Sequence, residues 1–319
     1  MQITTHEWKE LDLHEVARLT CAAKGSGGQT SAEAVERMVE RLDDHMAALP
    51  RYAVLARVGE QLVGWLMLVA QNPAKVEVNS WFLGGHPLVA PGQDRQAVGA
   101  PLLKQAIAWA RQGGFEAVEL GIERDLGADP QVYEAFNAWY ASLGFGVREE
   151  SLGFFRRLSS PELPAPVAPG DVELVAVTDV DQDELYDCYH AALADSQSGY
   201  FLDQGERERR AYFDTLGKTY GQHEGTSLAL LQKGRIVGFS YTAPFGEHLF
   251  LDWIGIHPDV RRRGLGRFLL LTVMERAACD GFRSMGLGCN ARNVRAIALY
   301  RGLGWEDGGD AEIKYAARL

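Results

Sequence analysis

The sequence carries one pattern twice, and this internal repeat constrains the fold more than any other feature. Most landmarks of the first half recur 167 residues later, and the last one recurs 160 residues later. A nearly constant offset over several landmarks is typical of an internal duplication. The chain is therefore predicted to hold two copies of one fold, with about seven extra residues in the first copy near 123–133. The matching landmarks are Val89-Ala90-Pro91 with Ile256-His257-Pro258, Gly99 with Gly266, Gly114-Phe115 with Gly281-Phe282, and Tyr140–Phe145 with Tyr300–Trp305.

Length and composition agree with two globular domains. The chain has 319 residues, of which 46% are hydrophobic and 24% charged, so either half can bury a core. Four prolines fall within residues 159–171 (SSPELPAPVAPGD), which indicates a semi-rigid linker. The predicted division is a first domain over 1–158, the linker over 159–171, and a second domain over 172–319.

The order of elements predicts the fold class. Each half shows two helical patterns, three strands, a helix, a strand, a helix and a last strand. In the first half the third strand is expected around 76–90. This order predicts a mixed α/β (α+β) sheet rather than a helical bundle.

The charge balance argues against one class of function. The formal net charge is −11, which argues against the broad basic face that nucleic-acid binding needs. No apolar run approaches the length of a membrane helix, and the first residues lack the pattern of a signal peptide, so a cytoplasmic protein is expected. Four scattered cysteines show no metal-ligand spacing, and no metal site is predicted.

The strongest local signal is IGIHPDVRRRGLGRFLL, residues 254–270. An apolar strand ends, a proline turns the chain, and glycines precede a long amphipathic helix. Glycine lets the backbone pass close to a ligand, and the free N–H groups at a helix start favour an anion. The segment therefore predicts a pyrophosphate cradle, although a solvated basic run before an ordinary helix is an alternative that this segment alone leaves open.

A second motif follows at residues 293–305. Asn293, Ala296 and Tyr300 have helical spacing and are expected on one helix face. Together the two motifs resemble those of the GCN5-related N-acetyltransferase (GNAT) superfamily in order and separation. Here they read Ile256-x-Pro258-x-x-Arg261-x-x-Gly264-x-Gly266 and Asn293-x-x-Ala296-x-x-x-Tyr300-x-x-x-Gly304-Trp305.

The resemblance implies two tandem GNAT folds, with acetyl-CoA as co-substrate and no metal. It implies direct attack of a substrate amine on the thioester, with a backbone N–H near Ile256 polarising the carbonyl oxygen and Tyr300 protonating the leaving thiolate. Tyr300 as a simple core residue is the alternative. The residues expected to bind acetyl-CoA are Ile254, Ile256, Arg261, Arg262, Arg263, Gly264, Leu265, Gly266, Arg267, Asn293 and Ala296.

A general base is required as well, because a primary alkyl amine is mostly protonated at neutral pH. Asp252 is the first candidate, since it lies four residues before Ile256 and the two-residue period places it on the same strand face. Some family members, such as polyamine acetylases, carry a glutamate there. Glu247 and His248, at the start of the strand, are alternatives that would act through water, and Asp252 as a plain polar strand residue is the other interpretation.

The first half departs from the motifs. An acidic residue and a Cβ stand where a phosphate should lie, which predicts a degenerate GNAT domain without catalysis. Arg95 and the helix start could still hold a CoA. The departures are Asp94 for Arg261, Ala97 for Gly264, Gly85 for Asp252, Tyr133 for Asn293, and Pro87 within the strand.

The sequence defines the acceptor substrate less closely than the acetyl-CoA site. A small amine is favoured weakly by the acidic charge, and the protein is expected as a monomer or a homodimer. The alternative function is a non-catalytic tandem GNAT protein that binds or senses CoA or recruits a protein partner. Possible acceptor contacts within residues 186–213, which could equally pack on the sheet, are Tyr189, His190, Asp195, Tyr200 and Glu206.

Overall fold

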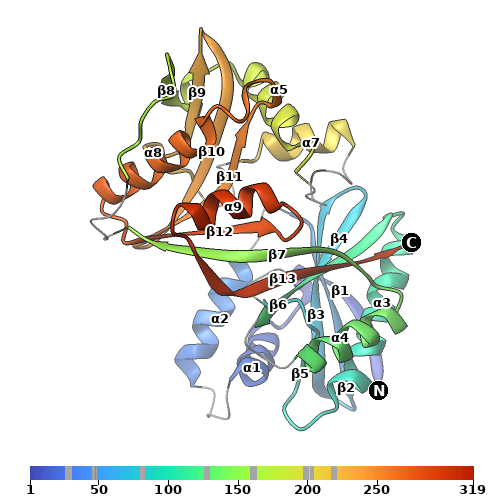
Figure 1. The fold of residues 1–319 in the computed structure, drawn as a ribbon. Coiled ribbons are helices and arrows are strands. Elements are labelled where there is room, and N and C mark those ends of the chain that lie inside the picture. Colours follow the sequence, from blue (N-terminus) through green and yellow to red (C-terminus); the bar gives the residue numbers. More distant parts are fainter. Residues whose placement is uncertain are drawn as a thin grey trace. The chain divides into compact units, whose positions relative to one another are not determined.

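The chain folds into two compact units. A computed structural model describes residues 1–25, 31–44, 47, 49–79, 83–125, 130–158, 164–196, 201, 205–216 and 221–319. Unit 1 comprises Met1–Glu149 and Glu312–Leu319, and unit 2 comprises Glu150–Ala311 (Figure 1). Both units are mixed α/β, as the repeat predicts.

Unit 1 is built on a sheet with the strand order β1-β2-β3-β4-β6-β13, with β5 pairing with β3. Its strands are β1 (Gln2–Glu7), β2 (Arg51–Val58), β3 (Gln61–Asn72), β4 (Lys75–Val78), β5 (Leu88–Val89), β6 (Ala117–Asp125) and the end of β13 (Glu306–Arg318). Its helices are α1 (Leu13–Lys24), α2 (Ala32–Asp44), α3 (Arg95–Gln112) and α4 (Pro130–Ser142).

Unit 2 repeats this plan with the strand order β7-β12-β11-β10-β9-β8. Its strands are β7 (Gly146–Arg157), β8 (Glu173–Ala176), β9 (Leu228–Gln232), β10 (Arg235–Phe245), β11 (His248–Ile256) and β12 (Ser284–Asn290). Its helices are α5 (Gln182–Leu193), α7 (Glu206–Phe213), α8 (Leu265–Cys279) and α9 (Val294–Gly302).

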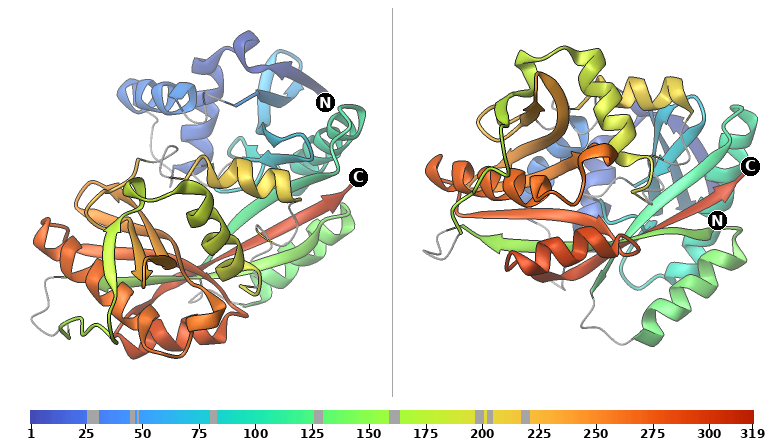
Figure 2. Two further views of the ribbon diagram at one scale, coloured as in Figure 1. Left: turned by 90° about the horizontal axis from the view of Figure 1, so that it is seen from above. Right: turned by 45° about the horizontal axis from the view of Figure 1, so that its top comes forward.

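The two copies exchange their last strands. Residues Ser151–Arg157 of β7, which end the first repeat, pair antiparallel with β12 of unit 2. The end of β13, which closes the second repeat, contributes Ile313, Tyr315 and Ala317 to the core of unit 1. Figure 2 shows the C-terminus among the elements of unit 1 in both views. The compact units therefore do not coincide with the repeats, because residues 150–158 lie with the second unit and 312–319 with the first.

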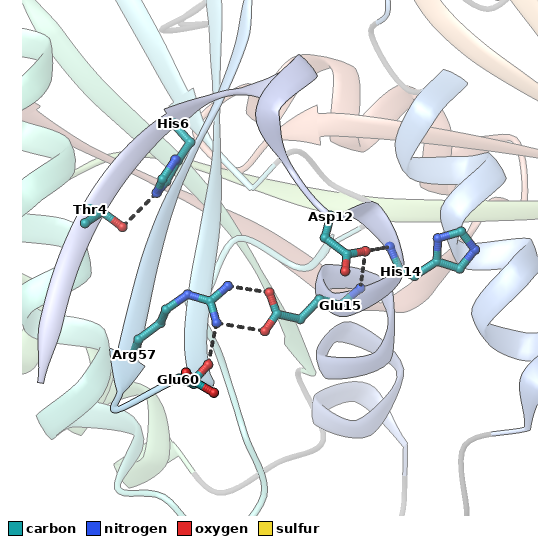
Figure 3. Close-up of polar contacts among 7 residues, drawn as sticks. All are labelled: Thr4, His6, Asp12, His14, Glu15, Arg57 and Glu60. Atoms are coloured by element: carbon teal, nitrogen blue, oxygen red, sulfur yellow. Dashed lines mark hydrogen bonds and ion pairs between the residues drawn. The ribbon is translucent and has the colours of Figure 1, made fainter.

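The first helix of each unit is anchored in a similar way. Asp12 caps α1 and Asp181 caps α5, each by accepting hydrogen bonds from two backbone N–H groups. In unit 1, Glu15 of α1 accepts two hydrogen bonds from Arg57 at the end of β2, which ties the helix to the sheet (Figure 3). In unit 2, Glu184 of α5 accepts from the backbone N–H of Ile236 at 2.9 Å and makes the matching link.

Three details of the expected layout differ from the structure. The single strand expected around 76–90 is wrong, since the chain forms the short strands β4 and β5 with glycine turns before Pro87. The sequence patterns also did not predict β1 and β8, the first strand of each copy. Where a loop over 123–133 was expected to hold the extra residues of the first copy, β6 has 9 residues against 7 in β12 and α4 has 13 against 9 in α9, while residues 126–129 lie outside the described part of the chain.

Within the described segments, no helix has the length and apolar character to cross a membrane. Residues 159–163 of the expected linker lie outside the described residues.

Candidate functional site

Two neighbouring strands of unit 2 part from each other and expose backbone between them. β11 pairs in parallel with β12 only from His248 to Phe250, although β11 continues to Ile256. Its other edge keeps an antiparallel pairing to β10 as far as Gly238 opposite Ile256. Figure 1 shows β11 and β12 running apart beyond their shared start. The last residues of β11 therefore have one edge whose N–H and C=O groups can pair with an extended ligand.

Asp252 lies at a bulge in β11. The register to β10 shifts between Tyr241 and Thr242, which pair with Trp253 and Leu251 and leave Asp252 as the extra residue. Accordingly Leu251 and Ile254, three positions apart, contact the same hydrophobic core, whereas simple alternation would separate them. Burial raises the pKa of the Asp252 carboxyl to about 6. A carboxyl with this pKa can exchange a proton near neutral pH.

A turn with left-handed backbone follows β11 and leads into α8. Arg262 and Gly264 have φ values of 62° and 83°. Gly264 is the N-cap of α8, and no side chain caps the helix there. The first N–H groups of a helix have no partner within the helix and carry the positive end of its dipole. The start of α8 therefore offers N–H donors to an anion.

The neighbouring residues of this turn shape the surface around those donors. Arg262, Arg263 and Arg267 are exposed, while Leu265 is buried in a small core with Val237. A Cβ on Gly266 would lie 3.5 Å from Ile256, so α8 packs closely against the end of β11. The turn thus brings exposed arginines and free N–H groups beside the open strand edge.

Arg261 has a different role from the other arginines of the turn. Its guanidinium donates to the backbone oxygen of Ile256 at 2.9 Å, to Asp195 Oδ2 at 2.6 Å and to the backbone oxygen of Ala192 at 2.7 Å. The donors of this side chain serve partners inside the protein, and its expected part in binding acetyl-CoA stays a prediction. The backbone of Arg261 remains part of the turn.

α9 carries the second motif. Asn293 is the N-cap, and its Oδ1 accepts from the N–H of Ala296 at 3.2 Å, so the two residues close the start of the helix. Tyr300 is buried, and its ring lies 5.7 Å from that of Phe154 and 5.9 Å from that of Trp305. Burial, with the neighbouring Cys289, raises the pKa of the Tyr300 hydroxyl, which keeps it protonated as an acid requires. Phe154 comes from the exchanged strand β7, and no sequence signal pointed to it.

The alternative bases lie at the other end of β11. Glu247 forms an ion pair with Arg283 at 3.0 Å, and His248 Nδ1 hydrogen-bonds to Ser284 Oγ. Both are held where β11 and β12 are still paired. The geometry favours Asp252 over them.

The expected acceptor residues on α5 and α7 are mostly engaged with each other. Tyr186 donates to Glu206 at 2.7 Å, and His190 lies 3.4 Å from the same carboxylate. Tyr189 is buried among aromatic rings that include Trp253 of β11 at 5.8 Å. Tyr200 lies outside the described residues. The packing of these aromatic residues agrees with the alternative that they support the sheet.

The corresponding helix start in unit 1 is capped by a side chain. Asp94 caps α3 by accepting from the N–H groups of Gln96 and Ala97, so its own carboxylate takes the anion position. The loop before β5 packs on β6, since a Cβ on Gly85 would lie 1.7 Å from the backbone oxygen of Gly121.

The family model described as "Acetyltransferase (GNAT) family" matches the chain twice, at residues 15–145 and 184–305. The chain belongs to the GNAT acetyltransferase family. The two matched segments correspond to the two repeats, so this is a tandem GNAT protein. The family uses acetyl-CoA as acyl donor.

Relatives cover the whole tandem arrangement or one half of it. A mycothiol acetyltransferase from Nocardia farcinica is 27% identical, with 95% of this chain and 93% of the relative covered. A mycothiol acetyltransferase from Thermobispora bispora is also 27% identical, with 77% of each chain covered. A ribosomal protein bS18-alanine N-acetyltransferase from Escherichia coli is 33% identical over 31% of this chain and 70% of its own length.

Solved structures share the fold over nearly the full chain. A tandem GNAT protein from the clavulanic acid biosynthesis pathway has a TM-score of 0.67 and 18% identity, covering 99% of this chain and 98% of its own. A GCN5-related N-acetyltransferase from Sphaerobacter thermophilus has a TM-score of 0.67 and 16% identity, covering 99% and 95%. At these identities the likeness concerns the fold alone.

Proposed function

We propose that unit 2 is the working site of this acetyltransferase and that it transfers the acetyl group of acetyl-CoA to a primary amine of a small molecule. The observation that carries the proposal is the start of α8, where Gly264 leaves the N–H groups without a side-chain cap beside the parted strands β11 and β12. Unit 1 has the same helix start covered by Asp94. Acetyl-CoA would bind with its pyrophosphate at the turn and its pantetheine along the open edge of β11.

The chemistry is a direct acyl transfer within a ternary complex. The amine nitrogen attacks the thioester carbon, the new C–N bond forms, and the C–S bond breaks. Backbone N–H groups near Ile256 would stabilise the charge that develops on the carbonyl oxygen.

Two side chains would handle the protons. Asp252, with a pKa of about 6, would accept the proton that the amine loses, because at neutral pH it is largely ionised. Tyr300, whose pKa is raised by burial, would donate its proton to the leaving thiolate.

The acceptor class is supported by the relatives that span the tandem arrangement. The mycothiol acetyltransferases match both halves, whereas the bS18-alanine acetyltransferases match less than one third of the chain. We therefore favour a small amine over a protein N-terminus.

A thiol-release assay tests the proposal. Acetyl-CoA is offered with a panel of small primary amines and with a peptide that begins with alanine, and free CoA is measured for the wild type and Tyr300→Phe. Turnover of small amines, lost in the variant, is expected. Preference for the peptide would overturn the acceptor class. Binding of acetyl-CoA without turnover of any amine would favour the non-catalytic alternative.

A further inference from the structure

The guanidinium of Arg261 joins three separate points of unit 2. It contacts the last backbone oxygen of β11 at Ile256, the backbone oxygen of Ala192 near the end of α5, and the carboxylate of Asp195 just beyond that helix. A planar guanidinium that donates to several fixed acceptors holds them in one geometry. The ion pair also keeps the pKa of Asp195 below its ordinary value.

In unit 1 the residue at the position of Arg261 is not an arginine, although Arg95 is the next residue. Asp94 stands at the position of Arg261 and turns its carboxylate to its own helix. Between the end of α1 and the turn after β5 there is a cavity of about 250 Å³, whose lining includes Ala23, Ala90, Pro91 and Arg95. The first helices of the two units begin with matching caps 169 residues apart, Asp12 and Asp181, and by this offset Ala23 corresponds to Ala192. Within unit 2, the Arg261 side chain thus contacts the end of α5, the counterpart of the α1 end that borders the cavity in unit 1.

We propose that Arg261 and Asp195 are a positioning pair that clamps the acetyl-CoA turn of unit 2 onto α5, and that the Arg261 side chain is not a phosphate ligand. The clamp rests on the proposed function of unit 2. Its effect follows from the attachment points: Arg261 lies at the start of the turn and holds the oxygen of Ile256, so loss of either partner loosens the backbone that would receive the ligand.

The proposal predicts the direction in which the affinity for acetyl-CoA changes in Asp195→Ala. If Arg261 were a phosphate ligand, Asp195 would compete with the phosphates for the guanidinium and repel them, so Asp195→Ala would tighten acetyl-CoA binding. If the pair is a clamp, Asp195→Ala removes a negative charge and still weakens binding. The structure therefore predicts that the loss of an acidic residue lowers the affinity for an anion.

The experiment measures the Kd of acetyl-CoA by calorimetry for the full-length wild type, Asp195→Ala, Asp195→Glu, Arg261→Gln and the double variant Asp195→Ala/Arg261→Gln. We expect about a tenfold rise in Kd for each single change to Ala or Gln, substantial recovery with Glu, and a double variant no worse than about twofold beyond Arg261→Gln, because the two side chains act through one contact. Asp259→Ala is the matched control, since Asp259 is an exposed acidic residue before the turn, with its carboxylate 3.6 Å from His257 Nδ1. It is expected to leave Kd within about twofold.

Melting temperatures are measured in parallel, and Kd values are compared at a temperature where every variant is folded. Tighter or unchanged binding in Asp195→Ala would overturn the clamp, as would additive losses in the double variant. Absence of binding by the wild type would instead refute the proposed function of unit 2, so the two failures are distinguishable.

Discussion

The two units of this chain share a fold but differ at the start of one helix. In unit 1, Asp94 caps α3 with hydrogen bonds of 2.8 Å to Gln96 and 3.0 Å to Ala97. In unit 2, Gly264 begins α8 with a φ of 83° and without a side-chain cap. A carboxylate satisfies helix N–H groups as a phosphate would, so the first helix start is closed by its own side chain and the second is left for a ligand.

A second difference concerns the strand that precedes this helix. β11 is continuous and parts from β12, whereas its counterpart is broken into β4 and β5. His86, shortly before β5, lies against Tyr140, whose hydroxyl is 2.8 Å from His86 Nδ1. Burial, with the nearby Arg95, lowers the pKa of His86 to about 4 and keeps the ring neutral. The tyrosine that occurs at this position in both repeats thus has an internal hydrogen-bond partner in unit 1.

The largest expected difference between the two units comes from a substitution in β13, the strand that the second repeat contributes to unit 1. Tyr315 of β13 is buried in the core of unit 1, with its ring 4.9 Å from that of Tyr140. Tyr315→Ala should destabilise unit 1 by about 4 kcal/mol and leave the acetyl-CoA affinity of unit 2 nearly unchanged. Calorimetric unfolding with and without ligand measures both. Phe154→Ala, on the strand given to unit 2, is the matched variant and should weaken ligand binding. Equal effects of the two changes on ligand binding would contradict the separation.

Gly264→Val tests the helix start itself. A β-branched residue at a φ of 83° is strained and moves the turn, so the Kd of acetyl-CoA should rise by at least about 100-fold. Ala97→Val changes the matching position of unit 1, where the residue is exposed on a regular helix, and should leave Kd unaltered. A loss of affinity in Ala97→Val would place ligand binding in unit 1.

Substitutions of Tyr300 and of its counterpart Tyr140 should have different effects on kcat. Tyr300→Phe is expected to lower kcat by about 100-fold with an unchanged Kd for acetyl-CoA, because it removes a proton donor and keeps the ring. Tyr140→Phe should leave kcat unaltered and cost about 1 kcal/mol of stability through the lost contact with His86. Steady-state kinetics and thermal unfolding provide the two measurements. Equal losses of kcat would show that both tyrosines, or neither, serve the reaction.

The smallest expected effect concerns the pH dependence of Asp252. Its pKa is raised to about 6 in the folded protein, so the buried charge destabilises the native state above that pH and not below the ordinary value of 3.8. Asp252→Asn should therefore raise the melting temperature by about 4 °C at pH 8, and this gain should disappear as the pH falls towards 4. The activity of the wild type should increase with pH through a midpoint near 6, as the base becomes ionised.

Asp259→Asn is the control for this titration, because its carboxyl is exposed. It should shift the melting temperature little at any pH. If Asp252→Asn gave the same melting temperature as the wild type at pH 8, the ionised Asp252 would not destabilise the native state, and the prediction would be wrong.

The sequence was sufficient to predict the duplication, the fold of each copy and the turn from Arg261 to Gly266. These features depend on local spacing, glycine chemistry and a constant offset, all of which can be seen along the chain. The departure at Asp94 was also visible, because it places a negative charge where a phosphate should lie, but the cap that it forms was not predicted.

Three features could not be predicted in this way. The exchange of β7 and β13 depends on which of two equivalent sheet edges a strand joins, and the period of a strand does not encode that choice. The bulge at Asp252 interrupts the alternation on which its expected strand face was based. The contacts of Arg261 join residues 66 and 69 positions apart, and spacing within the motif gives no sign of partners so far away along the chain.

The stoichiometry of acetyl-CoA binding to the full-length wild type tests the central claim most directly. Titration calorimetry should show one site per chain, because unit 2 has an uncapped helix start beside parted strands, whereas in unit 1 Asp94 caps the helix start and the strand before it is split into β4 and β5. Two sites per chain, or one site that survives Gly264→Val, would contradict this account.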